Sequence, residues 1–261
     1  MLNTIVYGTP TDLPDLLIVH GLFGSGRNWS AIGKRLARTR RVISVDQRNH
    51  GESPWFDSHS YEDMAADLAE VIVAEAKHGR DPAMDVLGHS MGGKAAMVLA
   101  LTRPELVRSL IVADIAPVTY EHDQKQYIQS MRSVDLSQVV KRSDALEQLE
   151  ATVDDPALRS FFTQSLDIAN TRWRLNLDVL EAEMPKVIGF PEMEGTYEGP
   201  TFFLSGSLSD YVLPEHRANI RPLFPKARFA KITGANHWLH AEKPHEFIAS
   251  VQAWLDQAPT E

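Results

Sequence analysis

The feature that most constrains the fold is an abrupt change of pattern around Ser90. The run Met84–Ser90 (MDVLGHS) is largely apolar, as in a buried strand, whereas Met91–Leu101 carries the small and apolar residues of a helix. Gly88 and Gly92 stand two residues to either side of the serine. Because glycine lacks a Cβ atom, it relieves the crowding where a strand passes directly into a helix. We therefore predict a tight strand–turn–helix unit with Ser90 at its apex.

A serine at such an apex is suited to nucleophilic catalysis. The pattern Gly-x-Ser-x-Gly is a nucleophile elbow, in which a strained turn projects the hydroxyl beyond the end of the sheet. The hydroxyl of Ser90 would stand at a helix N-terminus, where backbone N–H groups favour negative charge. The alternative is a glycine-rich turn that only lets the helix pack closely on the sheet. We expect Ser90 to be a nucleophile.

The rest of the chain alternates in the same way between strand-like and helical patterns. Helical periodicity is found at Tyr61–Ala76 and Pro244–Leu255. Short apolar runs predict further buried strands at Asp15–Gly21, Arg41–Asp46, Ser109–Asp114, Thr201–Gly206 and Ala227–Thr233. This alternation predicts an α/β fold with a mostly parallel sheet and helices on both faces.

One segment interrupts the alternation. From Val118 to Gly199 no strand-like run is found. Helical patterns occur instead at Lys125–Met131, Ser143–Val153, Ala157–Leu166 and Trp173–Val187. We expect residues 1–117 and 200–261 to form the core and residues 118–199 to form a helical insertion between two strands.

Composition excludes several classes of function. The chain of 261 residues has a formal net charge of −9, which disfavours nucleic acid and anionic membranes as partners. It contains no cysteine, so disulfides and thiolate chemistry are excluded. No convincing metal-ligand cluster, signal peptide or apolar span of about 18 residues is found. We expect a soluble cytoplasmic protein without a cofactor, and its oligomeric state stays open.

A nucleophilic serine requires a base and a third group that orients the base. His237 follows the last predicted strand, which places it at the same carboxyl edge of the sheet as Ser90. His50, His240 and His245 also lie in predicted loops or at helix ends, and only the place of His237 after the final strand distinguishes it from them.

Two aspartates and three backbone amides are candidates for the remaining roles. Asp114 and Asp210 each follow a predicted strand, and either could reach an imidazole at that edge. An oxyanion hole needs two N–H donors, of which Met91, directly after the nucleophile, supplies one. The loop His20–Trp29 (HGLFGSGRNW) supplies the other, from Leu22 or alternatively from Phe23.

These stretches together resemble the α/β-hydrolase superfamily. The matching motifs, in chain order, are HGLFGSGRNW, DQRNHGES, GHSMGG and GANHWLHAEKP. In detail they are similar to a branch of small bacterial and mitochondrial acyl esterases and thioesterases. The resemblance implies a mostly parallel eight-stranded sheet with a helical cap inserted after the sixth strand, and the strand-free segment 118–199 fits that cap.

Two departures from the family pattern affect the site. The acid often stands three residues after the glycine that ends the seventh strand, but here that position is Ser209, and Asp210 lies one step late. This favours Asp114, which the esterase branch is thought to use, over Asp210 or a cap carboxylate such as Asp178. The histidine loop usually reads Gly-His, where this chain has Asn236 before the histidine.

We expect a serine esterase that hydrolyses acyl esters through an acyl-enzyme. Thioesters are additional candidate substrates. Phe23 and Trp238 would line an apolar acyl pocket for a small-molecule ester. Ser90 argues against the members of the superfamily that carry an aspartate in place of the elbow serine. Carbon–carbon bond hydrolases and perhydrolases on the same triad remain alternatives, as does a non-catalytic ligand-binding member of the fold.

Overall fold

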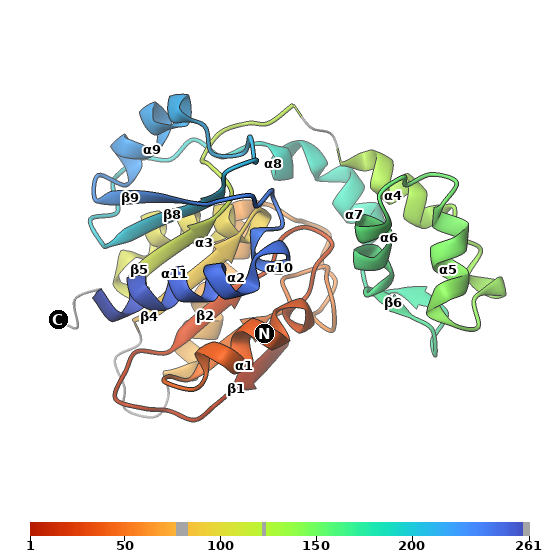
Figure 1. Ribbon diagram of the computed structural model, residues 1–261, viewed down its shortest axis with the longest axis horizontal. Helices are drawn as coiled ribbons and strands as arrows, with labels where there is room; N and C mark the ends of the chain where they lie inside the picture. The colour runs from red at the N-terminus through yellow and green to blue at the C-terminus, as the bar shows by residue number, and fades with distance from the viewer. Residues whose placement is uncertain (77–82, 122–123, 258–261) are drawn as a thin grey trace.

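The computed structural model describes residues 1–76, 83–121 and 124–257. They form a twisted sheet covered by helices, with a largely helical segment to one side (Figure 1). The strands are β1 (Thr4–Tyr7), β2 (Leu16–Val19), β3 (Val42–Val45), β4 (Met84–His89), β5 (Val107–Ala113), β6 (Leu166–Asp167), β7 (Arg172–Trp173), β8 (Thr201–Gly206) and β9 (Ala227–Ile232). The helices are α1 (Ser30–Leu36), α2 (Tyr61–Glu75), α3 (Met91–Thr102), α4 (Lys125–Arg132), α5 (Arg142–Leu149), α6 (Pro156–Thr163), α7 (Leu177–Ala182), α8 (Met184–Ile188), α9 (Arg217–Leu223), α10 (Leu239–Glu242) and α11 (Pro244–Gln257).

The main sheet confirms the predicted parallel architecture. Its strand order is β1-β3-β2-β4-β5-β8-β9, and all neighbouring strands are parallel except β1, which is antiparallel to β3. The described residues contribute seven strands to this sheet, one fewer than the eight that the resemblance implied. All six predicted strands are present. The unpredicted strand β1 lies at the edge of the sheet, and none of its four residues is fully buried, unlike those of a central strand.

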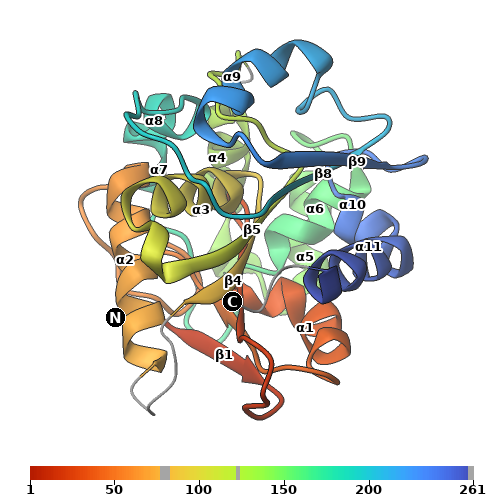
Figure 2. The same cartoon turned by 90° about the vertical axis from the view of Figure 1, so that its left-hand side faces the viewer.

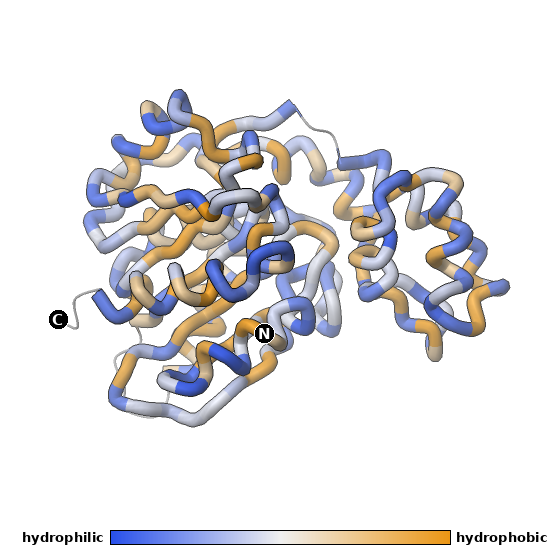
Figure 3. The backbone as a smooth tube through the Cα atoms, viewed as in Figure 1, coloured by the Kyte–Doolittle hydropathy of each residue, from blue (hydrophilic) through white to orange (hydrophobic). Residues whose placement is uncertain are grey.

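Both faces of the sheet are buried because apolar side chains alternate between them. In β2, Leu17 and Val19 belong to one apolar cluster, whereas Leu16 and Ile18 belong to the other. Helices α2 and α3 pack over the first face, and α1 and α11 pack over the second (Figure 2). Figure 3 accordingly shows hydrophobic residues along the central strands.

Residues 118–199, called the inserted segment below, connect β5 to β8 and contain α4 to α8. Two expectations about this segment are wrong. It is not free of strands, because β6 and β7 form a two-stranded antiparallel ribbon. Trp173–Val187 is not one helix, because Trp173 ends β7 and a proline in the first turn of α8 starts a new helix after α7.

The inserted segment is joined to the core by a shared apolar cluster. Its buried residues Ile128, Met131 and Phe162 belong to the same cluster as Leu68 of α2 and Met97 of α3. Within the three described ranges, no helix has the length and apolar character needed to cross a membrane.

Candidate functional site

Ser90 lies in the tight turn that the sequence predicted. Its backbone has φ 53° and ψ −123°, an unfavourable conformation for a residue with a side chain. A Cβ atom on Gly88 would lie 2.3 Å from the Gly92 carbonyl oxygen, and one on Gly92 would lie 2.4 Å from the Val19 carbonyl oxygen. Only glycine therefore fits at either position, and the close approach of α3 to β2 and β4 fixes the Ser90 hydroxyl at the end of the sheet.

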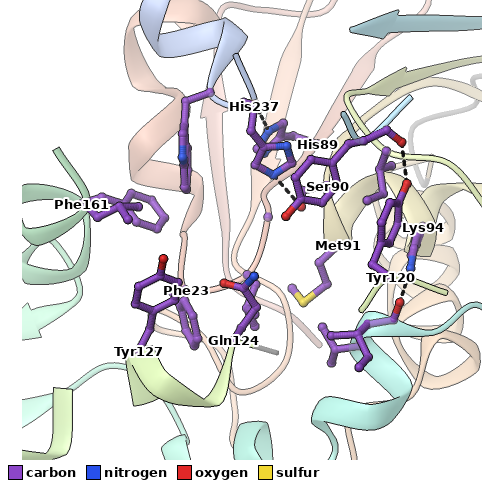
Figure 4. Close-up of a pocket in the computed structure, with 18 of the residues that line it drawn as sticks. Phe23, His89, Ser90, Met91, Lys94, Tyr120, Gln124, Tyr127, Phe161 and His237 are labelled. Atoms are coloured by element: carbon purple, nitrogen blue, oxygen red, sulfur yellow. Dashed lines mark hydrogen bonds between the residues drawn. The ribbon is translucent and has the colours of Figure 1, made fainter. Parts of the chain in front are cut away.

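The structure places His237 between Ser90 and Asp114. Its Nε2 atom lies 3.1 Å from Ser90 Oγ, and its Nδ1 atom lies 2.8 Å from Asp114 Oδ2 (Figure 4). The ring of Tyr211 stacks on the imidazole with centroids 4.0 Å apart. His89 Nε2 donates to the His237 carbonyl at 2.9 Å, and burial holds the pKa of His89 well below its ordinary value. These contacts fix the loop and the ring of His237.

Asp114, rather than Asp210, is the carboxylate in contact with His237. It follows β5, is fully buried and has φ 53°. Its Oδ1 accepts the Gly206 N–H at 2.9 Å, and its Oδ2 accepts the Ser209 hydroxyl at 2.5 Å. Ser209, at the position where the family pattern often has the acid, thus donates a hydrogen bond to a carboxylate supplied by the neighbouring strand.

The other carboxylates and histidines weighed from the sequence lie elsewhere. Asp210 is exposed at the surface, and the 90% exposed side chain of Asp178 pairs with an arginine of α4. His240 stacks on Trp29 with ring centroids 4.4 Å apart. His245 is exposed, and His50 is buried behind the loop that contains Phe23.

The loop after β2 lies directly against the nucleophile. A Cβ atom on Gly21 would lie 3.2 Å from Ser90 Cβ. The Gly21 carbonyl accepts from Gly24 N–H at 3.1 Å and from His20 Nδ1 at 2.8 Å. Because the carbonyl and N–H of one peptide point in opposite directions, these bonds direct the Leu22 N–H away from both donors.

Leu22 and Phe23, the two alternative oxyanion donors, differ in their hydrogen bonds. The Phe23 N–H donates to His50 Nε2 at 3.1 Å and is therefore occupied. Within the described residues, the N–H groups of Leu22 and Met91 have no hydrogen-bond acceptor. The arrangement favours Leu22 and Met91 as the pair of amides available to a bound oxyanion.

A mainly apolar cavity of about 220 Å³ opens onto Ser90 and His237. Phe23 and Trp238, both expected in the acyl pocket, line it, and Trp238 packs against Phe161 with ring centroids 4.4 Å apart. Tyr127 and Phe161 reach across from the inserted segment (Figure 4). The cavity is therefore built jointly by the core and the inserted segment.

Lys94 is a cavity-lining residue that sequence reasoning missed. Its side chain is almost fully buried one turn after Ser90, and its Nζ donates to the carbonyls of Val118, Ile188 and Gly189 at 2.9, 2.9 and 2.5 Å. Burial lowers the pKa of Lys94 to about 7. The sequence feature that could have identified it is a single lysine within the otherwise small and apolar run Met91–Leu101.

Comparisons with known proteins agree with the fold. Residues 14–244 match the family model for the alpha/beta hydrolase fold. The chain is 40% identical over 253 residues to the mouse (Mus musculus) protein named sn-1-specific diacylglycerol lipase ABHD11, covering 93% of this chain and 81% of the relative. It is 32% identical over 244 residues to esterase YbfF of Escherichia coli (strain K12), covering 92% of each.

A solved structure, described as a marine microorganism esterase, has a TM-score of 0.90 at 36% identity, covering 97% of this chain and 98% of that one. The chain therefore belongs to the α/β-hydrolase family. Within that family it groups with proteins named as esterases and lipases, which are carboxylic ester hydrolases.

Proposed function

We propose that the protein is a serine esterase that hydrolyses acyl esters through an acyl-enzyme on Ser90. The observation that carries the proposal is the unbroken chain from Ser90 Oγ to His237 Nε2 at 3.1 Å and from His237 Nδ1 to Asp114 Oδ2 at 2.8 Å. These are the contacts that a nucleophile, its base and the group orienting the base require.

The reaction begins when Ser90 Oγ attacks the ester carbonyl and its proton passes to His237 Nε2. The carbon–oxygen bond to the alcohol then breaks, and His237 returns the proton to the leaving alcohol. A water molecule, deprotonated by the same imidazole, then attacks the acyl-enzyme. The acyl bond to Ser90 Oγ breaks, His237 returns the proton to Oγ, and the carboxylic acid is released. Asp114 keeps the Nδ1 proton in place and stabilises the imidazolium through both half-reactions.

The Leu22 and Met91 amides stabilise the tetrahedral intermediates. Met91 begins α3, so its N–H belongs to a helix N-terminus that favours negative charge. Leu22 N–H lies on the loop packed against Ser90. Two such donors act where the negative charge develops, and removal of one typically costs about 10²–10³-fold in kcat.

The proposed substrate is a small, neutral acyl ester. The cavity is lined mainly by aromatic and aliphatic side chains, which favour an apolar acyl group. Lys94, the cavity-lining lysine, already donates to three backbone carbonyls, so the cavity offers a substrate carboxylate little compensation for its desolvation. The inserted segment serves as a cap over this pocket. Thioesters have the same acyl group and are candidate substrates.

Hydrolysis of p-nitrophenyl esters with acyl chains from acetyl to palmitoyl tests the proposal, with Ser90→Ala as the blank. We expect turnover that disappears in the blank, with a maximum at one chain length set by the pocket. The matching acyl thioesters form a second series. Activity that persists in Ser90→Ala would refute the assignment of the nucleophile.

The acid is tested by Asp114→Asn against Asp210→Asn. We expect Asp114→Asn to lower kcat by roughly 10⁴-fold, because an amide no longer holds the required histidine tautomer. Asp210→Asn is the matched control and should stay within about twofold of the wild type, as surface substitutions usually do. A larger loss of kcat in Asp210→Asn than in Asp114→Asn would refute the assignment of Asp114 as the acid.

A further inference from the structure

The loop that carries Leu22 is held in a strained turn. The bond from Gly24 N–H to the Gly21 carbonyl closes a four-residue turn whose third residue is Phe23. Phe23 has φ 63°, at a turn position where glycine or asparagine is usual for positive φ. A bulky residue in this region costs on the order of 1 kcal/mol or more, so surrounding contacts must hold it there.

Both polar backbone groups of Phe23 are fixed by buried partners. Its N–H donates to Nε2 of His50, whose Nδ1–H donates to the Arg48 carbonyl at 2.9 Å. His50 is therefore the tautomer that accepts at Nε2. The Phe23 carbonyl accepts the hydroxyl of Ser165 at 2.9 Å. The partner of the Phe23 N–H thus comes from the core, and the partner of its carbonyl comes from the inserted segment.

The inserted segment touches the same loop at two further points. Asn28 Nδ2 donates to Gln164 Oε1 at 2.5 Å, and the ring of Phe162 meets the edge of the Phe23 ring at a centroid distance of 5.7 Å. Ser165 itself is buried, and its carbonyl accepts the Arg174 N–H at 2.8 Å. Helix α6 ends at Thr163, and the next two residues, Gln164 and Ser165, both contact the loop.

These contacts connect Ser165 to the chemistry through the turn. If Phe23 relaxed to a negative φ, the turn closed by Gly24 N–H would open. The Gly21 carbonyl would then lose one of the two donors that orient the Gly21–Leu22 peptide. The N–H of that peptide is the proposed oxyanion donor, and it would no longer be fixed opposite Ser90.

We propose that Ser165 is a positioning residue for ester hydrolysis: its hydrogen bond to the Phe23 carbonyl keeps the Leu22 amide in place, so the oxyanion hole is complete only while the inserted segment is docked on this loop. The inference rests on the proposed function. It assigns to the inserted segment a part in stabilising the transition state, in addition to forming a wall of the acyl pocket.

Ser165→Ala tests this, with p-nitrophenyl butyrate as substrate and butylboronic acid as the probe of the tetrahedral state. We expect kcat to fall roughly tenfold, a fraction of the cost of losing an oxyanion donor outright, and the inhibition constant of the boronic acid to rise by a similar factor. KM should stay within about twofold, because the acyl pocket is unchanged. Ser165→Thr keeps the hydroxyl and should restore most of the lost activity.

The matched control is Ser160→Ala, which removes an exposed hydroxyl from α6 of the same segment and should behave as wild type. Unchanged kcat and boronic acid affinity in Ser165→Ala would overturn the inference, as would a rise in KM alone or equal impairment of the Thr variant. If the wild type itself shows no Ser90-dependent turnover, the proposed function fails, an outcome distinct from an active wild type matched by Ser165→Ala.

Discussion

Lys94 offers a direct test of how burial acts on a charge beside the candidate site. Its side chain is 1% exposed, and burial lowers its pKa from 10.5 to about 7. In the unfolded chain the same amine keeps its proton up to the ordinary pKa. Between pH 7 and 10.5 the unfolded state therefore binds more protons than the native state, and the contribution of Lys94 to stability rises with pH.

The size of this effect follows from the two pKa values. Between pH 7 and 10.5, each pH unit adds at most about 1.4 kcal/mol to the free energy of unfolding. The gain is smaller near pH 7, where Lys94 is only partly deprotonated in the native state. From pH 7 to pH 9 the free energy of unfolding should therefore rise by about 2 kcal/mol through Lys94 alone. Lys94→Met has a side chain of similar length without a titrating group, so this rise should be absent.

Urea unfolding of the wild type and Lys94→Met at pH 7, 8 and 9 measures the difference. Lys226→Met, at an exposed lysine, is the control and should show a constant difference from the wild type over this interval. A wild-type-minus-Lys94→Met difference that is also constant would refute the reasoning. It would mean that the carbonyls of Val118, Ile188 and Gly189 keep Lys94 charged despite burial.

Three further predictions concern the turn, the acid and a buried histidine. Gly92→Ala should destabilise the protein by at least about 2 kcal/mol in urea unfolding, because its Cβ would lie 2.4 Å from the Val19 carbonyl oxygen; an unchanged midpoint would contradict the close packing. Adding Ser209→Asp to Asp114→Asn should recover at least about tenfold of the roughly 10⁴-fold loss in kcat, since the Ser209 hydroxyl lies 2.5 Å from Asp114 Oδ2; a double variant as inactive as the single one would argue against it. His240 is buried and its pKa is lowered to about 3, so between pH 6.5 and about 3 the unfolded state binds more protons than the native state, and stability falls as the pH falls. His240→Phe should lose about 3 kcal/mol less than the wild type between pH 6.5 and 4 in urea unfolding, and parallel curves would exclude this role.

The central strands could be predicted from sequence because they are buried on both faces. Strand β2 is a continuous apolar run and β8 has three consecutive apolar residues at its centre, so both can be recognised without an alternating pattern. Edge strand β1 was not predicted, because its apolar run is short and none of its four residues is fully buried. The two-residue strands β6 and β7 are too short for any periodicity and form only because the inserted segment folds back on itself.

The candidate site divides in the same way between local and non-local information. Ser90 and its glycines are a local pattern, and the position of His237 after the last strand follows from the topology of a parallel sheet. The choice between Asp114 and Asp210 could not follow from local pattern, because each aspartate comes after one of two adjacent strands, β5 and β8. The bond between Ser209 and Asp114 joins residues 95 positions apart, and only the fold brings them together.

Backbone strain at Phe23 and Asp114 could not be predicted from the sequence, whereas the strained turn at Ser90 could. Phe23, Ser90 and Asp114 all have positive φ, and of these three residue types only aspartate is enriched in that region. Each is held by a bond from its own amide to a distant group: Phe23 to His50, Ser90 to the Ala113 carbonyl and Asp114 to the Leu204 carbonyl. The cost of on the order of 1–3 kcal/mol per residue is thus offset by contacts that exist only in the folded sheet. The geometry around Ser90 is therefore a property of the whole core, and loosening a neighbouring strand or the loop on the inserted segment should affect catalysis before it affects substrate binding.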